Sequence, residues 1–141
     1  MKFYAGKWIL GGIVFGIIAW IINGILGMLT GRFYTGDIWR PMIGGSFIVT
    51  TLAFNILGGL LFALMYAFLY RGVPCKTGAG KGALFGFFIL IGTTLYGMCM
   101  SYLFVKISLV VILFWILGAL LSNVIGGAAL GAIYNPKKEK E

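Results

Sequence analysis

Four long apolar stretches leave this chain very little choice of fold. They cover residues 8–30, 43–70, 82–105 and 107–134. A helix needs about 20 apolar residues to cross a hydrocarbon core roughly 30 Å thick, so each stretch can span a membrane once. Only 10% of the 141 residues are charged, against about a quarter in a soluble domain. We therefore predict an all-α integral membrane protein with a single four-helix transmembrane domain over residues 1–141.

Ionisable groups are missing from the predicted spans. The chain has no His, and its three acidic residues, Asp37, Glu139 and Glu141, all lie outside the apolar stretches. Intramembrane carboxylates and imidazoles are the usual parts of proton relays and metal sites. No Ser stands near a plausible base either, so we expect no catalytic residue, no metal, no cofactor and no enzymatic activity.

One short motif resembles a phosphate-binding loop but lacks the residues that such a loop needs. KTGAGKG at 76–82 would require Gly at position 75 and Ser or Thr at position 82, where the chain has Cys75 and Gly82. No strand precedes it. Because these residues are missing, we expect no nucleotide binding. We expect no nucleic-acid binding either, since contact with the anionic headgroups of the lipid bilayer accounts for the net charge of +8.

Basic residues are distributed unevenly between the two sides of the predicted helices. Short loops rich in Lys and Arg stay in the cytoplasm. The basic residues on the side of the termini are Lys2, Lys7, Arg71, Lys76, Lys81, Lys137, Lys138 and Lys140, and those on the other side are Arg32, Arg40 and Lys106. This count predicts cytoplasmic termini, with a charged cytoplasmic tail at 136–141, in a bacterial or archaeal cytoplasmic membrane.

Aromatic residues near the predicted span ends suggest the two belts that membrane proteins place at the headgroups. The predicted cytoplasmic belt contains Tyr4, Trp8, Tyr66, Tyr70 and Tyr134, and the predicted outer belt contains Tyr34, Trp39 and Tyr102.

The chain has a weak internal repeat. A shift of 70 residues aligns Gly12 with Gly82 and Gly16 with Gly86, and a shift of 68 aligns the Asn-x-x-Gly-Gly at 55–59 with the same pattern at 123–127. Each alignment has about six identities, against about two expected by chance in so Gly- and Leu-rich a chain. We predict a duplicated two-helix hairpin, residues 8–72 and 81–135, in parallel orientation with a pseudo-twofold axis along the membrane normal.

Every span carries a polar residue four positions before a glycine. The pairs are Asn23 with Gly27, Asn55 with Gly59, Thr93 with Gly97 and Asn123 with Gly127. Residues four apart share a helix face, and faces of small residues let membrane helices approach closely. Further close-packing glycines are predicted at Gly12, Gly16, Gly82, Gly86 and Gly131. The polar side chains should then hydrogen-bond at helix contacts or, alternatively, line the path of a solute.

Two segments support a local resemblance. TTLAFNILGGLLFA at 50–63 resembles the second helix of the small four-helix fluoride channels, and GTTLYG at 92–97 is similar to the break in their third helix. This resemblance implies a channel, but the first-helix Arg of that family falls here on Ala19, and its pore phenylalanines fall on Leu95 and Met98.

The whole chain more closely resembles uncharacterised small bacterial four-helix membrane proteins with a Gly-rich first helix and a Lys-Gly-x-x-x-Gly third helix, here 81–86. That resemblance implies no activity.

Two functional hypotheses follow. The first is a non-catalytic structural or accessory subunit that packs through its Gly- and Asn-rich helix faces, as a homo-oligomer or within a larger membrane complex. The alternative is a small oligomeric channel or carrier for an anion or a neutral solute, with Asn23, Asn55, Thr93 and Asn123 along the path.

Overall fold

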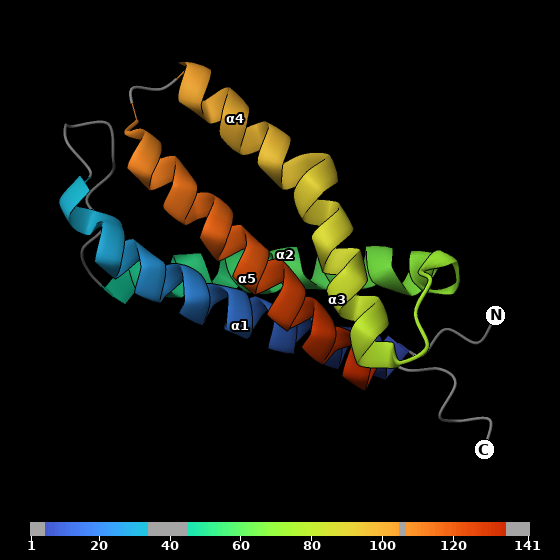
Figure 1. Ribbon diagram of the computed structural model, residues 1–141. Helices are drawn as coiled ribbons and strands as arrows, with labels where there is room; N and C mark the ends of the chain where they lie inside the picture. Colours follow the sequence, from blue (N-terminus) through green and yellow to red (C-terminus); the bar gives the residue numbers. More distant parts are fainter. Residues whose placement is uncertain (1–4, 34–44, 105–106, 135–141) are drawn as a thin grey trace.

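The computed structural model describes residues 5–33, 45–104 and 107–134 (Figure 1). Its helices are α1 (Ala5–Thr30), α2 (Gly45–Leu69), α3 (Gly78–Ile89), α4 (Leu95–Phe104) and α5 (Leu109–Ile133). The 3-10 turns η1 (Gly31–Phe33) and η2 (Tyr70–Gly72) extend α1 and α2, and a π-helical turn, η3 (Leu90–Thr94), joins α3 to α4.

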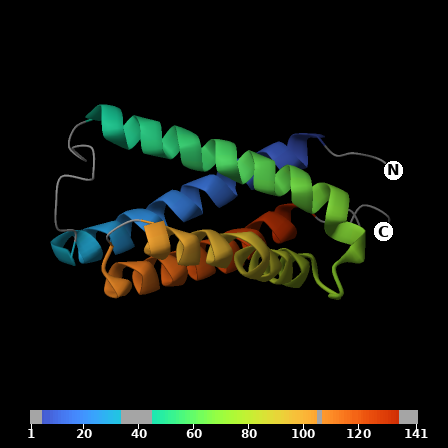
Figure 2. The same ribbon diagram turned by 90° about the horizontal axis from the view of Figure 1, so that it is seen from above.

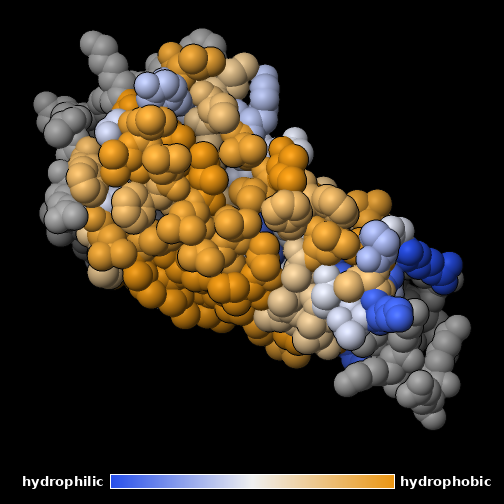
Figure 3. All heavy atoms as spheres, in the orientation of Figure 1, coloured by the Kyte–Doolittle hydropathy of each residue, from blue (hydrophilic) through white to orange (hydrophobic). Residues whose placement is uncertain are grey.

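The predicted all-α architecture with four long apolar helices is confirmed. Four helical segments are long and apolar enough to cross a membrane: Gly6–Thr30, Gly45–Gly72, Gly78–Leu103 and Leu109–Ile133. Large apolar side chains are exposed along all of them, and they cover the middle of the molecular surface, whereas hydrophilic residues gather at one end (Figure 3). An apolar middle surface of this kind is suited to the hydrocarbon core of a bilayer.

The helices alternate in direction, so the molecule has two distinct ends. At the basal end, α1 begins, α5 finishes and the connection joins α2 to α3; at the distal end, α1 finishes and α5 begins (Figure 1). Helix α1 packs between α2 and α5, and α5 packs between α1 and α3. Figure 2 shows α2 crossing α1 and separating from it toward the distal end.

The α1–α2 contact is a contact between backbones. A Cβ added to Gly12 would stand 3.0 Å from the carbonyl oxygen of Gly59, and one added to Gly16 would stand 2.6 Å from the carbonyl oxygen of Asn55. A Cβ at Gly59 would in turn meet the carbonyl of Gly12. Only glycine allows two helices to approach this closely.

The α3–α5 contact uses the same kind of residue. Gly82 faces the backbone of Gly127, Gly86 faces the carbonyl of Asn123, and Gly131 faces the carbonyl of Gly78. Two other glycines that the sequence predicts to pack closely do not: no atom of another residue lies within 4 Å of a Cβ placed at Gly27 or Gly97. Both lie nearer the distal end, where the helices have separated.

Helix α3 begins at Gly78, earlier than the predicted start at residue 82. Thr77 is extended and caps the helix, because its side-chain oxygen accepts a hydrogen bond from the Gly80 N–H at 3.1 Å. The additional turn places Lys81 inside the helix, where it is 6% exposed. Its Nζ donates to the Tyr70 carbonyl at 2.9 Å and lies 4.5 Å from the centre of the Tyr70 ring.

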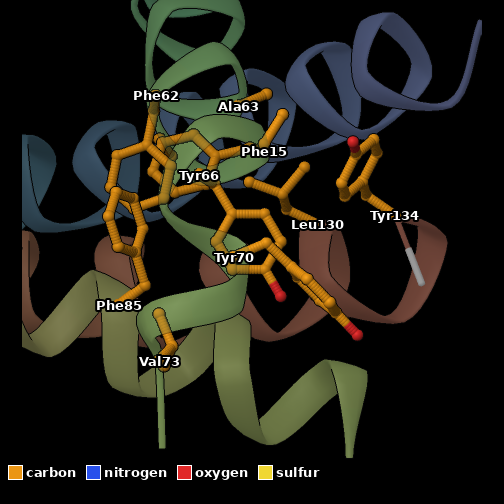
Figure 4. Packing of buried hydrophobic residues seen from close by; sticks show 11 residues of the cluster. Phe15, Phe62, Ala63, Tyr66, Tyr70, Val73, Phe85, Leu130 and Tyr134 are labelled. Atoms are coloured by element: carbon orange, nitrogen blue, oxygen red, sulfur yellow. The ribbon is translucent and has the colours of Figure 1, made fainter. Parts of the chain in front are cut away.

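An aromatic cluster fills the space between the two close-packed pairs near the basal end (Figure 4). Its members are Phe15, Ala19, Phe62, Ala63, Tyr66, Ala67, Tyr70, Val73, Phe85, Leu130 and Tyr134. Phe15 stacks on Phe62 at 4.2 Å, and Phe62 meets Phe85 edge to face at 5.1 Å. Tyr66 and Tyr134, predicted to belong to a headgroup belt, are instead fully buried in this core, and Tyr66 donates to the Gly78 carbonyl at 3.2 Å.

The π-helical turn separates the third span into two halves. Helix α3 packs extensively against α5, whereas α4 makes far less contact with it, and the ribbon bends between them (Figure 1). A π turn closes i→i+5 hydrogen bonds and changes the helical register of everything that follows. The change redirects α4 away from the line of α3.

We predict that Gly82→Ala destabilises the protein and that Gly27→Ala does not. A Cβ at Gly82 would stand 2.7 Å from the carbonyl carbon of Gly127 and 2.9 Å from the Gly131 nitrogen. Overpacking of this kind costs about 1–3 kcal/mol. Gly27→Ala meets no atom and should leave the free energy of unfolding unchanged or raise it by up to about 1 kcal/mol. Unfolding by SDS titration from a mild detergent, followed by circular dichroism, measures both. Equal losses would contradict the close α3–α5 contact.

Candidate functional site

All four spans contribute to one groove inside the helical domain. Its volume is about 460 Å³, within the usual range for small-molecule sites. The lining residues are Phe15, Ala19, Asn23, Phe54, Asn55, Gly58, Gly59, Phe62, Thr94, Met98, Trp115, Ala119, Ser122 and Asn123. Helices α1 and α5 form its floor, and α2 and α4 stand on either side. Among the described residues α2 and α4 make little contact with each other, so the groove lies where the bundle is least closed.

Three of the four predicted polar positions meet in this groove. Asn23 comes from α1, Asn55 from α2 and Asn123 from α5. The fourth, Thr93, does not line it; Thr93 is exposed and donates to the Ile89 carbonyl of its own helix at 2.8 Å. Thr94 lines the groove instead, because the π turn changes the register of the third span at this point.

The amide of Asn55 is oriented by its own helix. Its Nδ2 donates to the Thr51 carbonyl at 2.8 Å, which leaves the Oδ1 acceptor and the second N–H of the amide for other partners. One turn toward the distal end, the Trp20 indole donates to the Thr51 hydroxyl at 3.1 Å and links α1 to α2. The polar side of α2 is thus held in one orientation beside the groove.

Asn23 has room because a glycine faces it. A Cβ placed on Gly118 of α5 would stand 3.0 Å from the Asn23 Oδ1 atom. Asn23 is exposed, and it is one of the residues that line the groove. The α1–α5 contact therefore presents an amide at the distal part of the groove and does not enclose it.

Ser122 is the most unusual member of the set. It is 4% exposed, it lines the groove, and its hydroxyl has no hydrogen-bond partner. Leaving a buried hydroxyl unsatisfied costs about 1–3 kcal/mol, and such groups are rare enough in folded proteins to require an explanation. Ser122 and Thr94 are not among the predicted polar positions, although each lies directly beside one of them in the sequence, Asn123 and Thr93.

The remaining walls are apolar and aromatic. Phe15 and Phe62, stacked on each other, belong to the aromatic cluster and line the groove where it meets that cluster. Phe54, Met98 and Trp115 line it toward the distal end. The groove thus combines a polar strip from three helices with flat apolar surfaces, and it stops at the aromatic cluster.

No charged residue lines the groove among those the structure describes. The nearest buried cation, Lys81, is bonded to Tyr70 in the basal cluster. Within the described ranges no three His, Cys, Asp or Glu side chains come together as metal ligands. Cys75 and Cys99 are free, exposed thiols at separate places, the first between α2 and α3 and the second on α4.

No family model, no curated protein and no solved structure matches this chain. The resemblance to fluoride channels therefore remains a prediction from the two quoted segments.

We predict that Ser122→Ala increases the stability of the ligand-free protein. Removing an unsatisfied hydroxyl removes its desolvation cost, so the free energy of unfolding should rise by about 1 kcal/mol. Ser101→Ala is the matched control, since the Ser101 hydroxyl on α4 donates to its own helix at the Gly97 carbonyl (2.9 Å) and lies outside the groove; it should change stability by less than about 0.5 kcal/mol. A loss of stability in Ser122→Ala would mean that this hydroxyl is bonded in the folded protein.

Proposed function

We propose that this chain is a membrane carrier or gated channel for a small uncharged or anionic solute, which binds in the groove between α2 and α4. One observation carries the proposal: Asn23, Asn55, Asn123 and Ser122, whose buried hydroxyl has no partner, all line a single space of about 460 Å³. Lipid chains in that space would leave the unbonded amide atoms and the Ser122 hydroxyl without partners, and each unsatisfied polar group in hydrocarbon costs several kcal/mol. A polar solute or water satisfies them.

The aromatic cluster supports a gated mechanism. Phe62 contacts both Phe15 and Phe85 at the basal limit of the groove, so these rings stand between a solute in the groove and the basal end. Carriers that work by alternating access hold their solute at mid-membrane, open toward one side at a time. Passage through this chain requires the cluster to move.

A structural or accessory subunit is the competing proposal. The observation that favours it is the large exposed apolar surface on α2, where Phe54 and Phe68 are each about two-thirds exposed (68% and 67%). Another subunit, or a second copy of this chain, would cover such side chains as well as lipid does. Purification in a mild detergent followed by mass spectrometry tests this alternative, since a stoichiometric partner would support it.

We also propose that the two hairpins arose by duplication. The support is that the α1–α2 and α3–α5 contacts use corresponding residues. In the first pair Gly12 faces Gly59 and Gly16 faces the Asn55 carbonyl. In the second pair Gly82 faces Gly127 and Gly86 faces the Asn123 carbonyl. The predicted repeat pairs these same positions. For orientation we propose a cytoplasmic basal end, which is supported by the eight basic residues on the side of the termini against three on the other.

Thiol labelling of intact cells tests the orientation. Native Cys75 is exposed in the basal connection, and Gly31 is exposed at the distal end with no other residue within 4 Å of its Cβ position. In a Cys99→Ala background, a membrane-impermeant maleimide should not react with Cys75. It should react with Gly31→Cys when both native cysteines are replaced by Ala. The reverse pattern would refute a cytoplasmic basal end.

Flux into proteoliposomes tests transport. We expect urea or nitrate to enter vesicles that contain the protein faster than it enters empty vesicles. Ala119→Phe fills the groove and should reduce the protein-dependent rate about tenfold or more, because passage depends on the free cross-section. Ala132→Phe is the matched control on the same helix, at an exposed position outside the groove, and should leave the rate unchanged. Rates equal to those of empty vesicles for both solutes would refute transport and favour the accessory subunit.

A further inference from the structure

The hydrogen-bonding groups of the groove determine which charge its solute can carry. None of the described lining residues is ionisable. Removing an ion from water costs several kcal/mol unless a partner of opposite charge compensates for it. Lys81, the buried cation among the described residues, already contacts the Tyr70 carbonyl and ring in the basal cluster. The groove offers an ion no compensating charge.

The polar strip presents acceptors as well as donors. One N–H of the Asn55 Nδ2 group is bonded to the Thr51 carbonyl, so this residue contributes its Oδ1 acceptor and one remaining N–H. Each other amide carries one acceptor and two donor hydrogens, and the Ser122 hydroxyl can do both. An anion, which only accepts, would face carbonyl oxygens; a cation, which only donates, would face N–H groups. A neutral amide-like group matches both kinds of partner.

The other walls require an apolar part of the solute. The stacked Phe15 and Phe62 rings, together with Phe54 and Trp115, surround the polar strip with flat surfaces. Flat apolar groups pack well against aromatic rings in offset or edge-to-face arrangements. A solute with a planar apolar face would cover these rings while its polar edge reaches Ser122.

We infer that the groove binds uncharged planar solutes that combine an amide-like edge with an apolar face, an assignment that rests on the proposed solute-binding function. Ser122 determines the choice, because its buried hydroxyl gains its only partner when such an edge is bound. For a charged solute of the same shape, the desolvation cost exceeds the free energy gained from hydrogen bonds with the polar strip.

Three probes of one shape and different charge test this inference. At neutral pH benzamide is uncharged, benzoate is an anion and benzamidinium is a cation. Equilibrium binding to the purified protein in lipid nanodiscs should be saturable for benzamide and at least about tenfold tighter than for either charged probe. Ser122→Ala should weaken benzamide binding roughly fivefold, the equivalent of one hydrogen bond, and Ser101→Ala, outside the groove, should not.

Benzoate or benzamidinium binding as tightly as benzamide would overturn the inference, and so would the absence of saturable benzamide binding. Benzamide binding that Ser122→Ala leaves unchanged would also overturn it, since the contact would then lie elsewhere. These results are separate from those of the flux assay. Selective benzamide binding without flux would refute transport and support the ligand class, whereas flux of nitrate with tight benzoate binding would support transport and refute the class.

Discussion

Backbone contact between glycine faces is the interaction on which the rest of this molecule depends. In a bilayer, apolar side chains gain little by leaving lipid for another helix, so association relies on close packing. Gly12 and Gly16 on α1, and Gly82 and Gly86 on α3, bring carbonyl oxygens of the partner helix to where a Cβ would otherwise stand. These contacts extend from the basal end to about the middle of the helices. Helices that touch there and cross at an angle separate toward the other end, and the groove occupies the space between them.

Two further features convert that separation into a bounded site. The aromatic cluster fills the wedge between the two close-packed pairs and closes the groove at Phe15 and Phe62. The π turn at Leu90–Thr94 bends the third span between α3 and α4, and its residue Thr94 lines the groove. π turns within α-helices occur frequently at functional sites, since they shift register and open the backbone locally. The bend and the polar side chain fall at the same level of the third span.

Several polar side chains of the spans hydrogen-bond within their own helix. Thr30, Asn55, Thr93 and Ser101 each donate to the carbonyl four residues earlier, the common way to satisfy such groups in hydrocarbon. Ser122 is chemically able to do the same and does not. This contrast, within one chain and one environment, distinguishes the groove from ordinary intramembrane polarity and supports a site that gains a hydrogen bond when a solute binds.

The sequence by itself determined the four spans, because the length and apolarity of a stretch decide whether it can cross a bilayer whatever surrounds it. It also indicated which polar and small residues matter, since Asn in an apolar helix needs a partner. It did not determine which of them meet. Gly27 and Gly97 each follow a polar residue by four positions, as Gly59 and Gly127 do, yet nothing packs against their Cβ positions. Thr94, and not Thr93, lines the groove. Helix crossing and the π turn decided these outcomes: both change which face a residue presents, and neither leaves a periodic signal in the sequence.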